Sequence, residues 1–201
     1  MVFRYFNHRS PNRCELVNES HVDILGGYIE EGDAPYIQKY ASDEKVAWTC
    51  NIPHPYPANG GNEHVQRVLK RRQEGIAFAF SILVDTKFTG IIEINSIDRK
   101  AGTAELDYWV AASFWNNGVG TGAAAQAIEY AFEKLDLKIL RSACLVRNPA
   151  SGRVLEKNGF IEIGKITPEK GKFKAQPGRR FELLRSGWAK QNQDGKGSRS
   201  Y

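Results

Sequence analysis

The stretch from Ala104 to Phe160 constrains the fold of this chain most. It reads as a strand, a glycine loop, a long helix, a second strand, a short helix and the beginning of a third strand. Residues 104–110 alternate in a way that is typical of a half-buried strand. Residues 121–134 are rich in alanine, and their apolar side chains recur at helical spacing. The rest of the chain is therefore expected to support this unit.

Three glycines stand at the entrance of the long helix, in the sequence Gly-Val-Gly-Thr-Gly from Gly118 to Gly122. Glycine leaves backbone N–H groups uncovered, and together with the helix dipole these groups favour a bound anion such as a pyrophosphate. A tight strand-to-helix turn with close packing is an equal alternative. The loop fits neither the Gly-x-Gly-x-x-Gly dinucleotide fingerprint nor the P-loop, which requires a lysine.

A short helix is predicted after Asn148. Asn148 suits the N-cap, Pro149 suits the first helical position, and Gly159 ends the helix before a strand that begins at Phe160. Three sequence features occur together in this chain. They are Ala-Glu-Leu-Asp-Tyr-Trp-Val at 104–110, a Phe-Trp pair at 114–115, and Asn-Pro-Ala-Ser-Gly-Arg-Val-Leu-Glu-Lys-Asn-Gly-Phe at 148–160. In these features the chain resembles the GNAT superfamily, specifically the branch of the Rim-type ribosomal-protein-alanine N-acetyltransferases.

The resemblance covers roughly His21 to Trp188. Upstream of the central unit, the sequence predicts a long irregular loop at 46–61, a basic helix at 62–74 and a three-stranded meander that ends with the strand at 104–110. The order of elements favours an α+β fold, a GNAT-like mixed, mostly antiparallel sheet flanked by helices on both faces.

The domain organisation follows from length and composition. With 201 residues, of which 41% are hydrophobic and 25% charged, the chain is long enough for one buried core. We expect an N-terminal extension at 1–20, one domain at 21–188 and a flexible C-terminal tail at 189–201, where the sequence is polar and glycine-rich.

Composition also limits where the protein works. No apolar run approaches the ~18 residues of a membrane span, and the first 20 residues lack the apolar core of a signal peptide. The three cysteines, Cys14, Cys50 and Cys144, are odd in number and far apart, which indicates neither a disulfide framework nor a zinc site. A cytoplasmic protein is expected.

Basic charge is concentrated at the C-terminal end. Residues 165–201 carry ten Lys or Arg against three Asp or Glu, whereas the whole chain has a net charge of +5. Solvated loop charge is the favoured interpretation, although contact with an anionic partner such as a cofactor nucleotide stays open. Nucleic-acid binding is disfavoured, because the aromatic residues that RNA-binding surfaces interleave with such charge are absent.

The resemblance implies acetyl-CoA as co-substrate and no metal. The glycine-loop amides would hold the pyrophosphate, the backbone of Trp109 and Val110 would pair with the pantetheine arm, and the Val110 N–H would meet the acyl carbonyl. Asn148 would contact the pantetheine or order a water, and Arg153 would reach the phosphates. The full set of expected cofactor-binding residues is Trp109, Val110, Asn117, Gly118, Val119, Gly120, Thr121, Gly122, Asn148 and Arg153.

For catalysis we predict Glu105, Ser151 and Asn148. Glu105 is the expected base, directly or through water, with a solvent-facing carboxylate as the equal alternative; Glu93 and Asp107 are weaker competitors. Other GNAT branches carry a tyrosine seven residues after the asparagine to protonate the thiolate, whereas here that position is Leu155. In the Rim-type branch a serine has been assigned this role, which puts Ser151 forward unless it only caps its helix.

The expected reaction is direct attack of a primary amine on acetyl-CoA in a ternary complex. At pH 7, deprotonating a chain-terminal amine of pKa ~8 costs about 1.4 kcal/mol, against roughly 4.6 kcal/mol for lysine. This favours the α-amine of a protein N-terminus, and small-molecule amines remain open. A catalytically silent CoA-binding module is the alternative, because Asn116, Asn117 and Gly122 depart from the branch and the tyrosine is missing at Leu155. We expect no membrane partner, and a monomer or a homodimer.

Overall fold

The computed structural model describes residues 25–169 and 171–197, so the predicted extension at 1–20 lies outside the described part. Its centre is one seven-stranded sheet with the order β1-β2-β3-β4-β5-β7-β6. All neighbouring strands pair antiparallel except β4 and β5, which are parallel. The strands are β1 (Leu25–Tyr28), β2 (Phe78–Val84), β3 (Lys87–Asp98), β4 (Thr103–Val110), β5 (Ile139–Leu145), β6 (Ile161–Ile166) and β7 (Gly178–Leu184).

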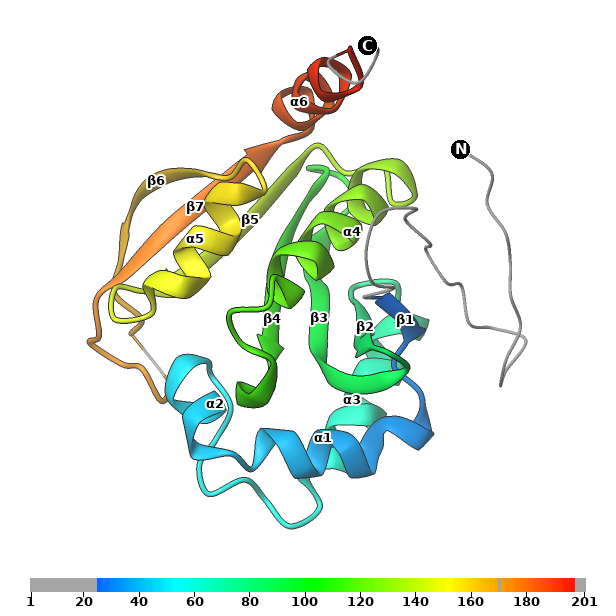
Figure 1. Ribbon diagram of the computed structural model, residues 1–201, viewed down its shortest axis with the longest axis vertical. Coiled ribbons are helices and arrows are strands. Elements are labelled where there is room, and N and C mark those ends of the chain that lie inside the picture. The colour runs from blue at the N-terminus through cyan, green and yellow to red at the C-terminus, as the bar shows by residue number, and fades with distance from the viewer. Residues whose placement is uncertain (1–24, 170, 198–201) are drawn as a thin grey trace.

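Helices cover both faces of the sheet (Figure 1). On one face α4 and α5 bury a core that includes Ile92, Leu106, Ile128, Phe132 and Leu155. On the other, α1 and α3 pack over Ala79, Phe88 and Ile91. The expected α+β fold is therefore confirmed. The helices are α1 (Ala34–Ala41), α2 (Glu44–Thr49), α3 (Gly60–Gln73), α4 (Val119–Glu133), α5 (Pro149–Lys157) and α6 (Arg185–Gly197), with short 3-10 turns at Glu31–Asp33 and Ala112–Phe114.

Alternation along the strands explains how each face receives its side chains. Ile92 and Ile94 on β3 point to the α4 side, whereas Ile91 on the same strand points to the α3 side. The β2–β3 hairpin turns at Asp85 and Thr86, which both have positive φ, of 49° and 64°. Two consecutive positive φ values are the geometry of a type I′ hairpin turn, which suits the twist of the flanking strands.

Two segments differ from the sequence expectation. The stretch expected to be irregular from 46 to 61 contains α2, because Asp43 accepts a hydrogen bond from the Lys45 N–H at the helix start and Val46 is buried. The segment predicted as a C-terminal tail contains the end of a second helix that the sequence did not predict, since α6 extends to Gly197. The first turns of α6 are anchored to the body, since the Trp188 ring lies 5.3 Å from that of Phe132.

Within residues 25–169 and 171–197, none of the helices has the length and apolar character needed to cross a bilayer.

The pairing of β4 with its two neighbours creates an opening in the sheet. On one edge β4 is paired with β3 along its whole length, in a register that places Glu93 opposite Asp107 and Gly90 opposite Val110. On its other edge β4 pairs with β5 over three residues only, and the last pair is Glu105 with Arg141. Beyond that point the two parallel strands diverge, and the sheet opens.

Candidate active site

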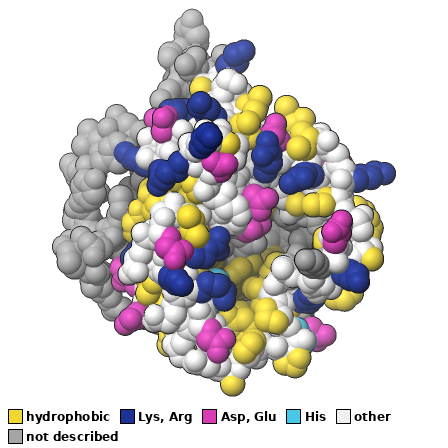
Figure 2. Space-filling view, turned by 180° about the vertical axis from the view of Figure 1, so that it is seen from behind, with side chains coloured by type: hydrophobic (Ala, Val, Ile, Leu, Met, Phe, Trp, Pro, Cys, Tyr) yellow, Lys and Arg dark blue, Asp and Glu magenta, His cyan; other side chains and the backbone are white. Residues whose placement is uncertain are grey.

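A cavity of about 780 Å³ passes through the opening between β4 and β5. One half is lined by the N-terminal ends of α4 and α5, on one face of the sheet. The other half is lined by α1, α3 and the 49–53 segment, on the opposite face. Figure 2 shows one side of the molecule, with a hollow whose floor carries hydrophobic side chains and whose rim carries Lys and Arg. We call the two parts the α4–α5 half and the α3 half.

The free edge of β4 faces this cavity. The Ala111 N–H donates to the Thr89 carbonyl at 2.7 Å, so alternation directs the backbone groups of Trp109 and Asp107 toward β3. The groups of Leu106, Tyr108 and Val110 then point toward β5. The Leu106 carbonyl accepts from the Ser142 hydroxyl at 2.8 Å, and the Val110 carbonyl accepts from the Trp115 indole at 2.7 Å.

This geometry corrects one part of the predicted cofactor contacts. The Trp109 backbone is directed into the β3 ladder and cannot pair with a ligand in the opening, although its side chain lines the cavity. The residues with N–H groups that face the opening beyond the last β4–β5 pair are Tyr108 and Val110. The sequence alone did not fix which alternate set of amides faces outward.

The start of α4 presents backbone donors to the same opening. Gly118 is the N-cap with φ of 78°, a left-handed conformation that glycine adopts without strain, and a Cβ there would meet open space. The Gly122 N–H donates to the Gly118 carbonyl at 3.0 Å, which makes it the first internal bond of the helix. The N–H groups of Val119, Gly120 and Thr121 therefore remain available, and all three residues line the cavity.

Two cations from α5 line the same cavity as these amides. Arg153 and Lys157 both line it, and their spacing of four residues places them on one side of the helix. Arg153 was predicted from sequence, whereas Lys157 was not. Asn117, where the resembling branch carries a basic residue, is not part of the lining, so the positive charge of this half comes from α5.

Tyr108 and Ser151 form a hydroxyl pair inside the α4–α5 half. The Tyr108 hydroxyl lies 2.9 Å from Ser151 Oγ and 3.2 Å from the Ser151 carbonyl oxygen, to which it donates. Burial raises the pKa of Tyr108, and its hydrogen bond to Ser151 only partly opposes this, so the phenol stays protonated. Leu155, which stands where other branches have tyrosine, is fully buried in the core. A phenol from β4 thus lies next to Ser151.

Asn148 connects the start of α5 to the end of α2. Its Oδ1 accepts from the Ser151 N–H at 3.2 Å, as an N-cap does, and its Nδ2 donates to the Thr49 carbonyl at 3.2 Å. Arg147 donates to the Trp48 carbonyl at 3.0 Å, and Lys172 to the Ile52 carbonyl at 2.7 Å. The 48–52 segment is therefore tied to α5 and to the β6–β7 connection at the mouth of the cavity.

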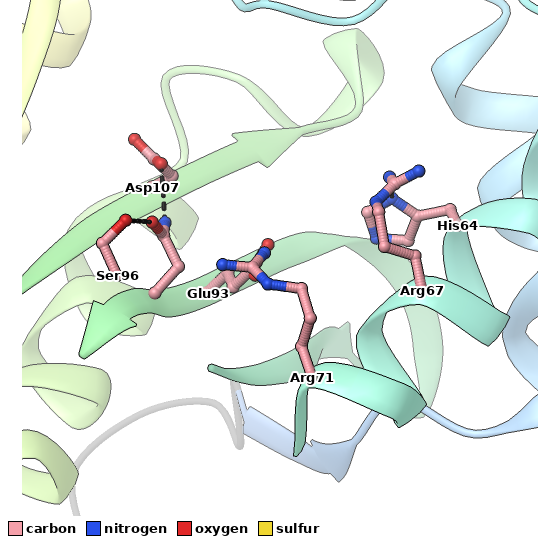
Figure 3. Close-up of polar contacts among 7 residues, drawn as sticks. His64, Arg67, Arg71, Glu93, Ser96 and Asp107 are labelled. Carbon is pink, nitrogen blue, oxygen red and sulfur yellow. Dashed lines mark hydrogen bonds and ion pairs between the residues drawn. The ribbon is translucent and has the colours of Figure 1, made fainter. Parts of the chain in front are cut away.

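The α3 half contains two carboxylates from adjacent strands (Figure 3). Asp107 Oδ2 accepts from Asn95 Nδ2 at 2.7 Å, and Asn95 Oδ1 in turn accepts from the Ser96 hydroxyl at 2.9 Å. Asp107 lines the cavity and its side chain is accessible there, but partial desolvation by the surrounding protein still raises the pKa of its carboxyl. The Asn95 hydrogen bond opposes this shift. Ser96 has φ of 51° and lies at the β3 bulge.

Glu93, the neighbour of Asp107 across the ladder, is ion-paired. Arg71 on α3 donates from Nη1 to Glu93 Oε1 at 2.6 Å, and the Glu93 side chain is 15% exposed. Burial nevertheless raises the pKa of the Glu93 carboxyl against the opposing influence of Arg71. Asp107 forms no ion pair with any residue in the described ranges. Of the two carboxylates, it is therefore the one that is available to accept a proton.

His64 and Arg67 lie one turn before Arg71 on the same helix. Arg67 Nη2 lies 2.7 Å from His64 Nδ1, and both residues line the cavity. Burial, reinforced by the charges of Arg67 and Arg71, lowers the pKa of His64 to about 4. The ring is therefore neutral at physiological pH.

The structure brings most of the predicted site residues together. Glu105 does not line the cavity; its side chain is exposed, beside the last β4–β5 pair, where the sheet is still closed. Asp107, two residues further on the same face, lies where the sheet has opened. Gly122 and Asn117 likewise stay outside the lining. The predicted residues that line the cavity are Trp109, Val110, Gly118, Val119, Gly120, Thr121, Asn148, Ser151 and Arg153.

Sequence reasoning missed the contribution of α3. Arg67 and Arg71 belong to a basic helix, and Arg71 precedes its partner Glu93 by 22 residues, so no local motif marks them. Their spacing of four residues was the available signal. The alternation of residues 104–110 predicted the strand that carries Tyr108, but the contact of Tyr108 with Ser151, 43 residues later, depends on how α5 packs on the sheet.

Residues 27–161 match the family described as acetyltransferase (GNAT) domain. The chain is 37% identical over 84 residues to YdaF of Bacillus subtilis, which is 42% of this chain and 46% of that protein. It is 32% identical over 100 residues to the ribosomal-protein-serine acetyltransferase of Escherichia coli, 50% of this chain and 56% of the relative. The chain spans about half the length of these curated relatives.

Solved structures share the fold. One is RimL, a ribosomal L7/L12 α-N-protein acetyltransferase in complex with coenzyme A, with a TM-score of 0.71 and 20% identity over 78% of this chain and 91% of that one. Another is spermidine N-acetyltransferase from Vibrio cholerae in complex with CoA and spermine, with a TM-score of 0.71 and 21% identity over 81% and 95%. The family match covers two thirds of the chain and runs from β1 to the start of β6. The resemblance read from the sequence is thereby confirmed, and the chain belongs to the GNAT acetyltransferase family.

Proposed function

We propose that this protein is an acetyl-CoA-dependent N-acetyltransferase that acts on a primary amine by direct attack. The observation that carries the proposal is the free edge of β4 inside a single cavity. That cavity joins the uncapped amides of α4 to two carboxylates on the opposite face of the sheet. Family membership and the names of the relatives, which include a ribosomal-protein acetyltransferase, support the same reaction.

The residues present fit acetyl-CoA, which would supply the acetyl group as a thioester. The N–H groups of Val119, Gly120 and Thr121, with the dipole of a 15-residue helix behind them, suit a pyrophosphate. Arg153 and Lys157 add positive charge to the lining of the groove. A Cβ on Gly120 would lie 3.7–3.8 Å from Val154, Tyr108 and Val110, at ordinary van der Waals distance, so Gly120 is next to the β4 edge and α5.

The β4 edge would hold and polarise the acyl donor. The Tyr108 and Val110 N–H groups face the opening and suit the amides of an extended pantetheine arm, as an added strand would use them. We retain Val110 as the donor to the acyl carbonyl, because its N–H is the last along β4 that points into the gap. A fixed backbone donor stabilises the negative charge that develops on that oxygen.

Asp107 is the base we propose in place of Glu105. It lies on the cavity, and its raised pKa brings it closer to that of the amine whose proton it removes. Glu93 is paired with Arg71, which leaves Asp107 as the carboxylate available to accept the proton. The amine nitrogen forms the new C–N bond as the C–S bond breaks, and Asp107 holds the amine's proton.

Ser151 stabilises the departing sulfur, with Tyr108 as its support. The Tyr108 hydroxyl donates to the Ser151 carbonyl, so the Ser151 hydroxyl hydrogen is left to point at Tyr108 or at a ligand. A phenol of ordinary pKa ~10, raised further by burial, exceeds a thiol of ~8.5. Hydrogen bonding to the thiolate is therefore favoured over complete proton transfer. Leu155 lacks the tyrosine hydroxyl of other GNAT branches, which favoured a catalytically silent module. The Tyr108–Ser151 pair supplies hydroxyl groups in its place.

The acceptor we propose is an α-amine of a protein or peptide N-terminus. One carboxylate base of raised pKa suffices for an amine of pKa ~8, whereas a lysine amine costs about 3 kcal/mol more to deprotonate at pH 7. We also propose a cytoplasmic setting, which the free thiols of Cys50 and Cys144 support.

The test is ligand-dependent stability followed by turnover. The melting temperature should rise with acetyl-CoA and CoA but not with NAD or ATP. Thiol release from acetyl-CoA should then depend on an added amine, with N-terminal peptides preferred to lysine side chains. A stability shift without release on any amine would favour a silent CoA-binding module, and no shift at all would refute the groove assignment.

A further inference from the structure

The α3 half of the cavity carries a cation, Arg67, that forms no ion pair with a carboxylate of residues 25–169 or 171–197, although its charge helps to lower the pKa of Glu93 against the larger effect of burial. The carboxylates that line this half are Glu93 and Asp107, and α3 contributes the arginines Arg67 and Arg71, of which Arg71 is paired with Glu93 at 2.6 Å. Arg67 lines the cavity and is exposed at its mouth, and its polar contact within the described residues is the uncharged His64 ring. The half thus offers one free negative group, Asp107, and one free positive group, Arg67.

His64 fixes how Arg67 is presented. A guanidinium only donates, so His64 Nδ1 accepts from Arg67 and the ring hydrogen must be on Nε2. Nε2 is buried and has no hydrogen-bond partner among the residues that the structure describes. Figure 3 shows His64 and Arg67 side by side on α3, with Arg71 reaching toward Glu93. The contact uses one edge of the Arg67 guanidinium and leaves its other donors for a ligand.

The distance between the two free charges, Arg67 and Asp107, can be estimated from the geometry of α3 and the sheet. Arg67 and Arg71 are one helical turn apart, about 5–6 Å between Cβ atoms. Arg71 bonds Glu93, which lies opposite Asp107 across a ladder with a Cα separation of about 5.5 Å. The anion site at Arg67 is therefore on the order of 10 Å from the base at Asp107. An extended peptide covers this in about three residues.

We infer that the acceptor is a polypeptide N-terminus with an acidic side chain at its second or third residue, whose carboxylate binds Arg67 while its α-amine lies at Asp107. This inference rests on the proposed function and names its substrate class. A free α-amino acid does not fit, because its amine and carboxylate lie on one carbon and cannot span the two groups. A polyamine does not fit either, because its several ammonium groups would meet one free carboxylate and an unpaired arginine.

The experiment compares peptides that differ at one position. Six-residue peptides with a common N-terminal serine would carry Glu, Gln or Lys at the second or at the third residue, and spermidine and free serine would serve as further acceptors. The kcat/KM of the wild-type protein for the best Glu peptide should exceed that for its Gln counterpart by about tenfold and that for the Lys peptide by more. Spermidine and free serine should be poorer than any peptide.

Charge changes at Arg67 provide the specific test. Arg67→Gln should bring the Glu-to-Gln ratio close to one, and Arg67→Glu should invert the preference toward the Lys peptide. Lys70→Gln is the matched control, since Lys70 is on the same helix, is exposed and pairs with Glu74. It should keep the wild-type ratio. Equal rates on Glu and Lys peptides, a preference for spermidine, or an unchanged ratio in Arg67→Gln would overturn the inference.

Peptide binding separates this inference from the proposed function. The affinity of the Glu peptide for the CoA-saturated protein is measured by calorimetry, with wild type and Arg67→Gln compared. Arg67-dependent binding without turnover would support the acceptor site and refute the proposed enzyme activity. Turnover without any acidic preference would refute the acceptor site alone. Neither binding nor turnover would overturn both.

Discussion

The two halves of the cavity are built by different means. The α4–α5 half depends on backbone amides, on glycine at the start of one helix and on two cations from another, all within residues 108–157. The α3 half depends on side chains that converge from α3, β3 and β4, such as the Arg71–Glu93 pair and the Asn95–Asp107 contact. A groove made of backbone suits an invariant ligand, whereas a pocket made of side chains can be altered to select an acceptor.

The largest effect expected is at the base of the α3 half. Asp107→Asn should lower kcat/KM by about 10²–10⁴-fold, the usual contribution of a general base, and leave acetyl-CoA affinity within about twofold. Steady-state kinetics and calorimetry measure the two quantities. Glu105→Gln is the matched control on the same face of the same strand and should behave almost as wild type. A Glu105→Gln variant as impaired as Asp107→Asn would restore Glu105 as the base.

The next effect belongs to the α4–α5 half and should leave the acceptor untouched. Arg153→Glu should weaken acetyl-CoA binding by about 10–100-fold, because a cation that hydrogen-bonds phosphate becomes a repelling anion. Raising the salt concentration should reduce this difference. Lys100→Glu, in the exposed turn between β3 and β4, controls for the change in net charge. Equal losses in both variants would indicate a long-range effect of net charge instead of contact.

A moderate effect is expected from the Tyr108–Ser151 hydroxyl pair in the α4–α5 half. Tyr108→Phe and Ser151→Ala should each lower kcat by about tenfold, consistent with the loss of one hydrogen bond to a charged group. If Tyr108 acts through Ser151, the double variant should be no slower than Ser151→Ala. Independent, multiplying effects would mean that the two hydroxyl groups act separately.

The smallest change expected is a shift in pH dependence. Asp107 must be ionised to act, so kcat/KM should fall as the pH drops through its raised pKa, above its ordinary value near 3.8. The Asn95 side chain donates to the ionised form, so Asn95→Leu should raise this pKa and move the acidic limb to higher pH. His64, neutral above pH ~4, should contribute no limb between pH 5 and 8. A limb that stays in place in Asn95→Leu would exclude Asp107 as its source.

The α4–α5 half is built from local sequence patterns and the α3 half from long-range contacts, which explains why the first was predicted better from the sequence. The glycine loop, the Asn148 cap and Ser151 are local patterns, and the structure places Gly118, Asn148 and Ser151 on the cavity as expected. The choice between Glu105 and Asp107 depended on where β4 and β5 part. That point is set by the packing of α5 and β7 against β5, which no window of sequence reports.

Long-range partners account for the other differences. The α2 helix forms in a stretch rich in proline and aromatic residues because Val46 is buried and because Arg147, Asn148 and Lys172 hold backbone carbonyls at and beyond its C-terminal end. Arg67 has no local signature, since its significance comes from its distance to a carboxylate on β4. Backbone features are thus predictable over short windows, while the acceptor pocket is a property of the assembled sheet and helices.

A crystal structure of the protein with CoA and an N-terminal peptide would test the central claim most directly. The account predicts the pyrophosphate on the Val119–Thr121 amides, the pantetheine along the Tyr108 and Val110 edge of β4, and the thiol between Ser151 and Asp107, with the peptide amine on the α3 side. A CoA molecule bound outside the β4–β5 opening, or a peptide amine on the α4–α5 side of the sheet, would contradict it.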